Sequence, residues 1–329
     1  MNIICEKIKM KCFKIFGIIW LCIFLAACAG QKGQKKSPAT FLNGIKQLKK
    51  GTAWYQKGCY KRALKDFLIA HEHFTAADNQ NGVAMSLNSL GNVYRHIGDL
   101  DSAILFFKES VRIYIRLDDQ IGQMRALSNQ AAALIDGHKY QDAAAILKVA
   151  FAIAVQAQVR PVILLSNQGV LLTKQKKYEK ADKILQTALA KVTSDNFDKI
   201  ENSGQVATLY FALGNLNLAR ENYQAAYGFF QKALALDQAG EFFLGIAADL
   251  AALGTTSVAL SKPESAMDFL TRSAKIYALL GNQEKLSLVM AELEKLAANT
   301  KGDIKINLDI TRHFVTQWLT GKIITGPCR

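Results

Sequence analysis

Residues 87–94 read Leu-Asn-Ser-Leu-Gly-Asn-Val-Tyr, residues 102–114 read Ser-Ala-Ile-Leu-Phe-Phe-Lys-Glu-Ser-Val-Arg-Ile-Tyr, and both stretches recur along the chain. Residues 265–277 repeat the second stretch, with Ser, Ala, Ser, Ile and Tyr at the same places. Leu-Ser-Asn-Gln occurs at residues 127–130 and again at residues 165–168. Self-similarity at a regular spacing is typical of repeat proteins, in which each unit packs only against its neighbours.

Six copies of the repeat align on one small residue, the anchor. Twelve residues after the anchor every copy has Ala, four residues further a large apolar residue, and three beyond that Ala or Ser. Small residues let two antiparallel helices approach closely, while the large residue fills the gap between them. The pattern therefore predicts a helix hairpin in each repeat. The anchors, spaced 40, 40, 38, 45 and 40 residues apart, are Gly51, Gly91, Ala131, Gly169, Gly214 and Gly254.

The second copy resembles the tetratricopeptide repeat, whose L-G-x-x-Y…A-x-x-x-F signature stands here as Leu90, Gly91, Tyr94, Ala103 and Phe107. The spacing near 40 is similar to that of the extended variety of this family. The resemblance implies an all-α, right-handed superhelical solenoid of about six helix hairpins over residues 44–283. Asn217 and Ser257 depart from the pattern, because they stand where the fifth and sixth copies should carry the aromatic residue of Tyr94.

The end of the array needs a cover, because a terminal hairpin cannot bury its apolar face alone. Residues 284–298 have Leu and Val at successive spacings of 3, 4 and 3, which predicts a capping helix. In the tail, residues 299–329, two patterns compete. Strand-like alternation is shown by Ile304, Ile306, Leu308 and Ile310, whereas one helical face is formed by Ile304, Leu308, Val315 and Leu319. An all-helical body offers no sheet edge, so we favour a helix or a docked tail.

The N-terminus has the features of an export signal. Four lysines precede an apolar run at residues 15–27, which is shorter than the roughly 20 residues of a membrane-spanning helix. Residues 25–28, Leu-Ala-Ala-Cys, resemble the lipobox of bacterial lipoproteins. The resemblance implies a signal peptide at residues 1–27 and acylation of Cys28, and Ala29 after it favours the outer membrane. A short uncleaved membrane anchor is the alternative.

The net charge of +14 is concentrated close to Cys28. Without residues 1–27 there remain 37 basic and 26 acidic residues, and residues 28–65 hold ten of these bases and no acid. Residues 66–329, with 27 bases and 26 acids, are nearly neutral. Because an anionic leaflet attracts a nearby basic residue by about 1 kcal/mol, residues 28–43 are either a membrane-facing tether or a solvated one. The body has no basic stripe interleaved with aromatics, which disfavours nucleic acid as a partner.

Side chains that carry chemistry are few. Cys59 and Cys328 remain once the leader and Cys28 are set aside. They could pair in an oxidising envelope, but their places near opposite ends of a long solenoid favour two free thiols. His71 and His73 point to different faces of a helix, so no metal site is expected. The chain has no Gly-rich phosphate loop, H-E-x-x-H or G-x-S-x-G motif. We expect no metal, no cofactor and no enzyme, with catalytic residues assembled only in space as the alternative.

The first helix of each repeat is expected to line a concave groove. In the extended repeats that the chain resembles, an Asn on this helix bonds the backbone of a bound peptide, which implies this role for Asn129 and Asn167. A side-chain amide suits the task because it both donates and accepts a hydrogen bond. The same groove is expected to include Asn92 and Asn215, one residue after their anchors, and the carboxylate partners Arg95 and Arg125. The alternative is that these Asn residues bond neighbouring helices and the Arg residues are solvated.

These features together predict a lipid-anchored tetratricopeptide-like scaffold of the bacterial cell envelope. It would hold an extended segment of another envelope protein in its concave groove, in envelope, pilus or cell-wall assembly. One alternative is a cytoplasmic regulator with an uncleaved N-terminal membrane anchor. Another is an enzyme or small-ligand receptor with a pocket inside the superhelix.

Overall fold

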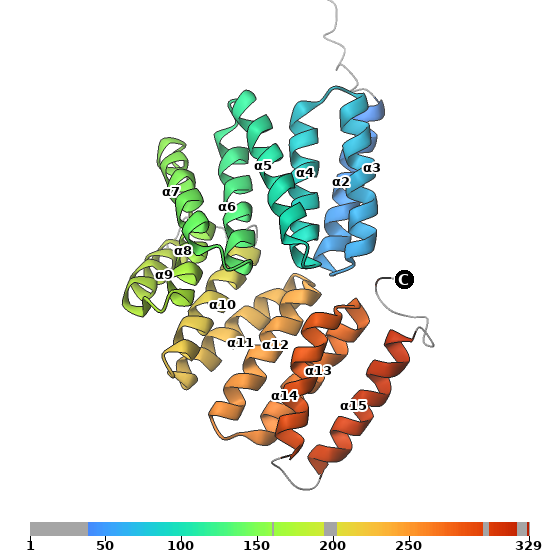
Figure 1. The fold of residues 1–329 in the computed structure, drawn as a ribbon, viewed down its shortest axis with the longest axis vertical. Coiled ribbons are helices and arrows are strands. Elements are labelled where there is room, and N and C mark those ends of the chain that lie inside the picture. The colour runs from blue at the N-terminus through green and yellow to red at the C-terminus, as the bar shows by residue number, and fades with distance from the viewer. Residues whose placement is uncertain (1–38, 160, 194–202, 299–302, 321–327, 329) are drawn as a thin grey trace, which may run out of the picture. The chain divides into compact units, whose positions relative to one another are not determined.

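The computed structural model describes residues 39–159, 161–193, 203–298, 303–320 and 328. The predicted signal peptide, Cys28 and most of the proposed tether lie outside them. These described residues form fourteen helices and no strand, and none of the helices is long and apolar enough to cross a membrane (Figure 1). The helices are α2 (Ala39–Gln56), α3 (Tyr60–Ala76), α4 (Gln80–His96), α5 (Leu100–Arg116), α6 (Gln120–Asp136), α7 (Tyr140–Gln156), α8 (Val162–Lys174), α9 (Tyr178–Thr193), α10 (Ser203–Ala219), α11 (Tyr223–Ala239), α12 (Phe243–Ala259), α13 (Pro263–Leu280), α14 (Gln283–Ala298) and α15 (Asp303–Leu319).

Most helices are 17 residues long and are separated by turns of three residues, so the module is about 20 residues and the repeat about 40. The spacing of 38 arises because α8, with 13 residues, is four residues shorter than the usual 17, while the five residues between α7 and α8 are two more than usual. The middle residue of each three-residue turn has a positive φ, as do Gln158 and Gly281 in turns of other lengths, and this conformation ends a helix by turning the chain back on itself. These residues are Gly58, Asp78, Gly98, Asp118, His138, Gln158, Lys176, Glu221, Glu241, Ser261 and Gly281.

The small and large positions of the repeat meet as predicted. Gly91 on α4 lies directly under the Phe107 ring of α5, and a Cβ added to Gly91 would overlap that ring. The same relationship joins the anchors and large residues of the other glycine-containing repeats, namely Gly51 and Phe67, Gly169 and Leu185, Gly214 and Phe230, and Gly254 and Leu270. The helix hairpin of each repeat is therefore confirmed. Helices α10 and α12 also form in full despite Asn217 and Ser257.

The C-terminal segment forms two further helices. In α14, Leu286, Val289 and Leu293 are buried in one cluster with Leu308 and Val315 of α15. The side chain of Thr311, between these two α15 residues, is also fully buried, and α15 packs on both α13 and α14. A helix is confirmed for this part of the tail and the strand pattern is wrong, because α13 and α14 offer an apolar surface on which Leu308 and Val315 pack. Leu319, which was predicted on the same face, is exposed.

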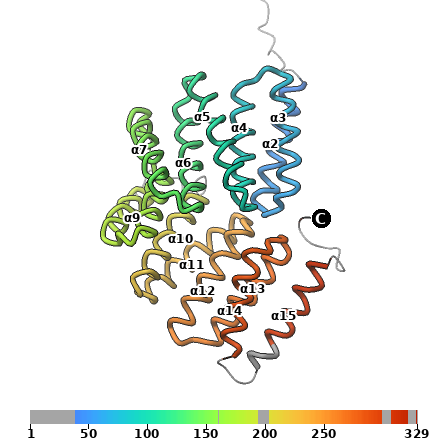
Figure 2. The backbone as a smooth tube through the Cα atoms, viewed as in Figure 1, coloured from blue at the N-terminus to red at the C-terminus, as the bar shows by residue number. Residues whose placement is uncertain are grey.

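Within residues 40–329 the two ends of the array meet. In Figure 1, α2–α6 form one row and α10–α15 another, with α7–α9 between them on one side, and Figure 2 traces the same path. Lys57 Nζ lies 3.8 Å from Glu241 Oε2, and the Tyr55 and Phe242 rings stack with centroids 6.5 Å apart. Gly58 lies against Leu280 at the end of α13. We call this contact, between residues 55–60 on one side and residues 241–242 and 277–282 on the other, the seam.

A disulfide joins Cys59 to Cys328 across the seam, over a separation of 269 residues, with the two Cα atoms 4.9 Å apart. The prediction of two free thiols is therefore wrong. It assumed that the first and last repeats of a solenoid lie far apart, as they do in an open array. The curvature that closes the array brings the first turn beside the C-terminal end of the chain.

Candidate functional site

The first helices of the repeats line the inner side of the curved array. Helices α4, α6, α8 and α10 contact one another in succession, and the contacts of the second helices α5, α7, α9 and α11 are with first helices rather than with each other. In a curved array of helix pairs, the layer whose neighbours lie closer together is on the concave side. The polar side chains between the first helices therefore define the candidate site.

Amide side chains tie these first helices together. Asn129 Nδ2 on α6 donates to Asn88 Oδ1 on α4, at 3.0 Å. Asn167 Nδ2 on α8 donates to both the carbonyl oxygen and the hydroxyl of Ser128 on α6, each at 3.0 Å. Asn167 is buried, so its amide serves the contact between helices. Asn129 is only partly buried, so its amide stays within reach of a ligand.

The two candidate arginines differ in their surroundings. Arg95 Nε on α4 lies 2.7 Å from Asp136 Oδ2 on α6, which neutralises its charge and links two first helices. Arg125 is exposed on α6. Its positive charge reaches the Tyr114 hydroxyl: burial raises the pKa of this hydroxyl to about 12, and the Arg125 guanidinium opposes part of that rise. Arg125 is therefore the candidate whose charge is more open to an incoming carboxylate.

Asn92 and Asn215 occupy equivalent places on α4 and α10 and are both partly buried. The structure does not gather the six predicted residues into one pocket. It distributes them over four first helices, and Asn88 and Ser128, which bond two of them, were not predicted. Their position within each first helix, one turn before the anchor, is the signal that would have identified them.

Charge is distributed unequally between the two layers. Of the two acids on the first helices, Asp136 is paired with Arg95, and Asp249 is 1 % exposed. The second helices α3, α5, α7, α9, α11 and α13 carry ten acids against 13 bases. The concave layer therefore presents amides and cations with little negative charge. The six bases of the first helices are Lys46, Lys49, Lys50, Arg95, Arg125 and Lys174.

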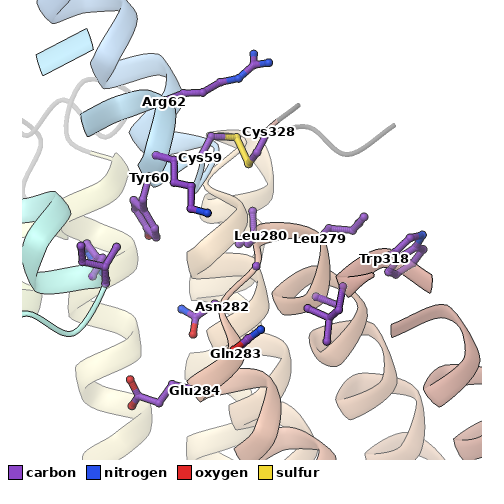
Figure 3. A pocket seen from close by; sticks show the side chains of 16 residues that line it. Cys59, Tyr60, Arg62, Leu279, Leu280, Asn282, Gln283, Glu284, Trp318 and Cys328 are labelled. Carbon is purple, nitrogen blue, oxygen red and sulfur yellow. A yellow bond between two sulfur atoms is a disulfide. The ribbon is translucent and has the colours of Figure 1, made fainter. Parts of the chain in front are cut away.

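A pocket of about 790 Å³ lies at the seam, and none of the six predicted residues lines it. Figure 3 shows the Cys59–Cys328 disulfide at its edge, with Leu280 and Asn282 across from it and Trp318 to one side. Arg62 also lines this pocket, and its guanidinium carbon lies 4.5 Å from the centroid of the Trp54 ring. The pocket therefore combines an apolar wall from α13 and α15 with polar groups from α3 and α14.

Aromatic rings form part of the pocket wall, since Tyr60 and His96 both line it. The Tyr60 and His96 rings are nearly parallel, with centroids 5.5 Å apart, and Tyr55 packs on both. Burial, with smaller effects of Arg95 and Lys285, lowers the pKa of His96 to about 3. Burial likewise raises the pKa of Tyr60, whose hydroxyl has no hydrogen-bond partner among the described residues. His96 is therefore neutral at physiological pH.

A buried carboxyl pair joins the fifth and sixth repeats. Asp237 on α11 hydrogen-bonds Asp249 on α12, and Gly245 leaves the space that the Asp237 carboxyl occupies. Burial raises the pKa of Asp237 to about 7 and, together with the charge of its partner, that of Asp249 to about 9. The sequence marks Asp237 as unusual, because the other repeats have an aromatic or aliphatic residue at the same place, 23 residues after the anchor. These residues are Phe74, Tyr114, Ala154, Val192 and Tyr277.

Metal-binding chemistry is not assembled in the described part of the chain, where no three His, Cys, Asp or Glu residues form a group suited to a metal ion. His71 Nδ1 lies 3.0 Å from Ser86 Oγ, across the contact between α3 and α4. This histidine therefore contributes to the packing of two helices.

The family model that matches residues 46–116 is described as a tetratricopeptide repeat. No curated protein matches the chain. Among solved structures, the Rap conjugation gene regulator of the plasmid pLS20 in complex with the Phr* peptide is 13 % identical. The match covers 89 % of this chain and 81 % of that chain, with a TM-score of 0.64.

Two further structures have a similar fold. A Rap protein complexed with Competence and Sporulation Factor is 16 % identical over 82 % of this chain and 77 % of that chain, with a TM-score of 0.54. Aspartyl phosphate phosphatase F from Bacillus subtilis is 17 % identical over 88 % of this chain and 73 % of that chain, also with a TM-score of 0.54. At these identities the likeness is one of fold.

Proposed function

The chain is a tetratricopeptide-repeat protein, and we propose that it is a lipid-anchored scaffold that binds an extended, acid-bearing segment of another envelope protein along its first helices. The observation that carries the proposal is the concave layer, which presents amides and cations and has no exposed unpaired carboxylate among its described residues.

The amides of this layer suit an extended backbone. A peptide in extended conformation exposes its N–H and C=O groups, and each side-chain amide can donate to one and accept from the other. Asn92, Asn129 and Asn215 are partly buried on successive parts of the concave layer. Their side chains are thus fixed by the helices around them, which lowers the entropy lost on binding.

The cations of this layer favour a segment that carries Asp, Glu or a terminal carboxylate. A guanidinium presents a planar set of donors that fits a carboxylate, and Arg125 is exposed. Asp136 and Asp249 do not oppose such a ligand, since one is neutralised by Arg95 and the other is buried. The Rap regulator of similar fold was solved with the Phr* peptide, which supports a peptide as the kind of ligand.

A crosslinking experiment tests the concave layer directly. A photo-crosslinking residue is introduced at Arg125 on α6 or, as a matched control, at Lys148, which is exposed on the second helix α7. We expect adducts at residue 125 whose partner peptides are acidic, and none at residue 148. Adducts only at residue 148, or equal labelling of both positions by the same proteins, would contradict the proposal.

The proposed location in the cell rests on the lipobox and on the charge distribution. Acylated Cys28 would anchor the protein, and the tether bases Lys32, Lys35 and Lys36 would lie beside phospholipid headgroups. We place it at the periplasmic face of the outer membrane. The alternative, a cytoplasmic regulator with an uncleaved anchor, would retain Met1.

An intact-mass measurement of the purified protein distinguishes the lipoprotein from a regulator with an uncleaved anchor. The proposed lipoprotein should have the mass of a chain that begins at an acylated Cys28, and Cys28→Ala should leave the unprocessed precursor. A mass that includes Met1 in both the wild-type protein and Cys28→Ala would refute lipidation. It would not affect the proposal that the concave layer binds a peptide.

A further inference from the structure

The seam is held by one covalent bond and by several weak contacts. The Lys57–Glu241 ion pair is 3.8 Å long, and its side chains are 42 % and 68 % exposed, so solvent screens their attraction. Gly58 contacts Leu280 through the flexible end of the leucine side chain. Stacking of Tyr55 on Phe242 adds one aromatic contact. The Cys59–Cys328 disulfide is the strongest connection in this set.

The two sulfur atoms are anchored unequally. Cys59 is 2 % exposed and is fixed in the first turn, since its N–H donates to the Trp54 carbonyl and its own carbonyl accepts from the Ala63 N–H. Cys328 is more exposed and lies next to the C-terminal residue. Both line the 790 Å³ pocket, through which a thiol reaches the bond from solvent.

We propose that the Cys59–Cys328 disulfide is a redox latch that holds the array closed at the seam. A dithiol reductant attacks the more exposed Cys328 sulfur, forms a mixed disulfide with it and releases Cys59 as a thiolate. The second thiol of the reductant then displaces Cys328. In total, the cysteine pair gains two electrons and two protons, and the dithiol is oxidised to its disulfide.

Reduction leaves the seam with only its non-covalent contacts. A local region of a protein opens more often when the contacts that hold it closed contribute less free energy. The turn at Gly58 then separates from Leu280 more often, and the backbone amides beside it exchange with water more readily. Any effect of this opening on the binding of an acidic segment rests on the proposed function, whereas the opening itself does not.

Hydrogen–deuterium exchange of the full-length protein tests the latch without any ligand. The amides followed are those of Tyr60 and Asn282 at the seam and, as internal controls, those of Lys139 and Lys262 in turns away from it. In the oxidised protein all four are hydrogen-bonded to backbone carbonyls. With a dithiol present, we expect about tenfold faster exchange at the seam amides and unchanged exchange at the controls.

The Cys328→Ser variant provides the matched comparison. It should exchange rapidly at the seam without reductant and show no further change when the dithiol is added. Equal seam protection in the oxidised, reduced and Cys328→Ser proteins would overturn the latch. Faster exchange at Lys139 and Lys262 as well would also overturn it, because the disulfide would then support the whole array rather than the seam.

Discussion

The carboxyl groups of Asp237 and Asp249 share a hydrogen bond inside the contact between the fifth and sixth repeats, where they are 8 % and 1 % exposed. Two carboxyls can bond to each other only when at least one is protonated. The other repeats place no such pair at the equivalent positions. The closed array therefore contains one contact between repeats whose strength depends on pH.

Stability should decline as the pH rises, because both pKa values are raised above the unfolded value of about 3.9. The folded protein holds protons that the unfolded chain releases, so this contribution is fully present below about pH 4 and is lost as the pH passes about 7 for Asp237 and about 9 for Asp249. Thermal melting of the oxidised protein at pH 5, 7 and 9 should show the decline. Asp249→Asn should flatten it, whereas Asp142→Asn on the exposed face of α7 should not. An unchanged pH slope in Asp249→Asn would contradict the assignment.

The surroundings of two glycines predict opposite effects of the same Gly→Ala substitution on stability. Gly91→Ala should lower the free energy of unfolding by about 1–3 kcal/mol, because the new methyl group overlaps the buried Phe107 ring. Gly228→Ala on α11 should raise it by about 0.5–1 kcal/mol, because nothing lies within 4 Å and alanine favours the helix. Urea unfolding of the two variants measures both changes. Equal stabilisation of both variants would show that the glycines act through helix propensity alone and would contradict the close approach of α4 and α5.

The fold could be predicted from sequence because each repeat encodes its own packing. The pairing of Gly91 with Phe107, 16 residues later, is a local relationship that any one copy reveals. Closure of the array could not be predicted in this way. It results from a small rotation between successive repeats, and the contacts that record it, such as Lys57 with Glu241, have no periodic pattern.

The candidate site was only partly predictable for a related reason. The alignment located Asn129 and Asn167 on first helices, and both lie there. It did not reveal that Asn167 is bonded to Ser128 in α6, the first helix of the preceding repeat, since the repeat pattern fixes the position along a helix but not the partner on the neighbouring one. The sequence does indicate Asp237, because the other copies have an aromatic or aliphatic residue at this position.

Asn167 should matter for stability, since it is buried and donates to Ser128. Asn167→Ala should lower the free energy of unfolding by about 1–3 kcal/mol, because the Ser128 carbonyl and hydroxyl lose their hydrogen-bond donor. Asn92→Ala on α4, at a partly exposed position, should cost less. Urea unfolding of both variants tests the difference, and equal losses would show that the bond to Ser128 contributes nothing particular.

The exposed cation of α6 predicts a charge preference that direct binding can measure. A fluorescent ten-residue peptide rich in Glu should bind more tightly than the same peptide with Lys at those positions. Arg125→Ala should weaken binding of the acidic peptide by about 10–100-fold, because a hydrogen bond to a charged group contributes roughly 1.5–3 kcal/mol. The melting temperature should stay unchanged because the side chain is exposed. Lys148→Ala on the outer layer should alter neither quantity. The preference should also weaken as salt is raised from 50 to 500 mM, since exposed charges are screened. Equal affinity for the two peptides at low salt would reject an acidic partner, while crosslinks at residue 125 would still support binding by the concave layer.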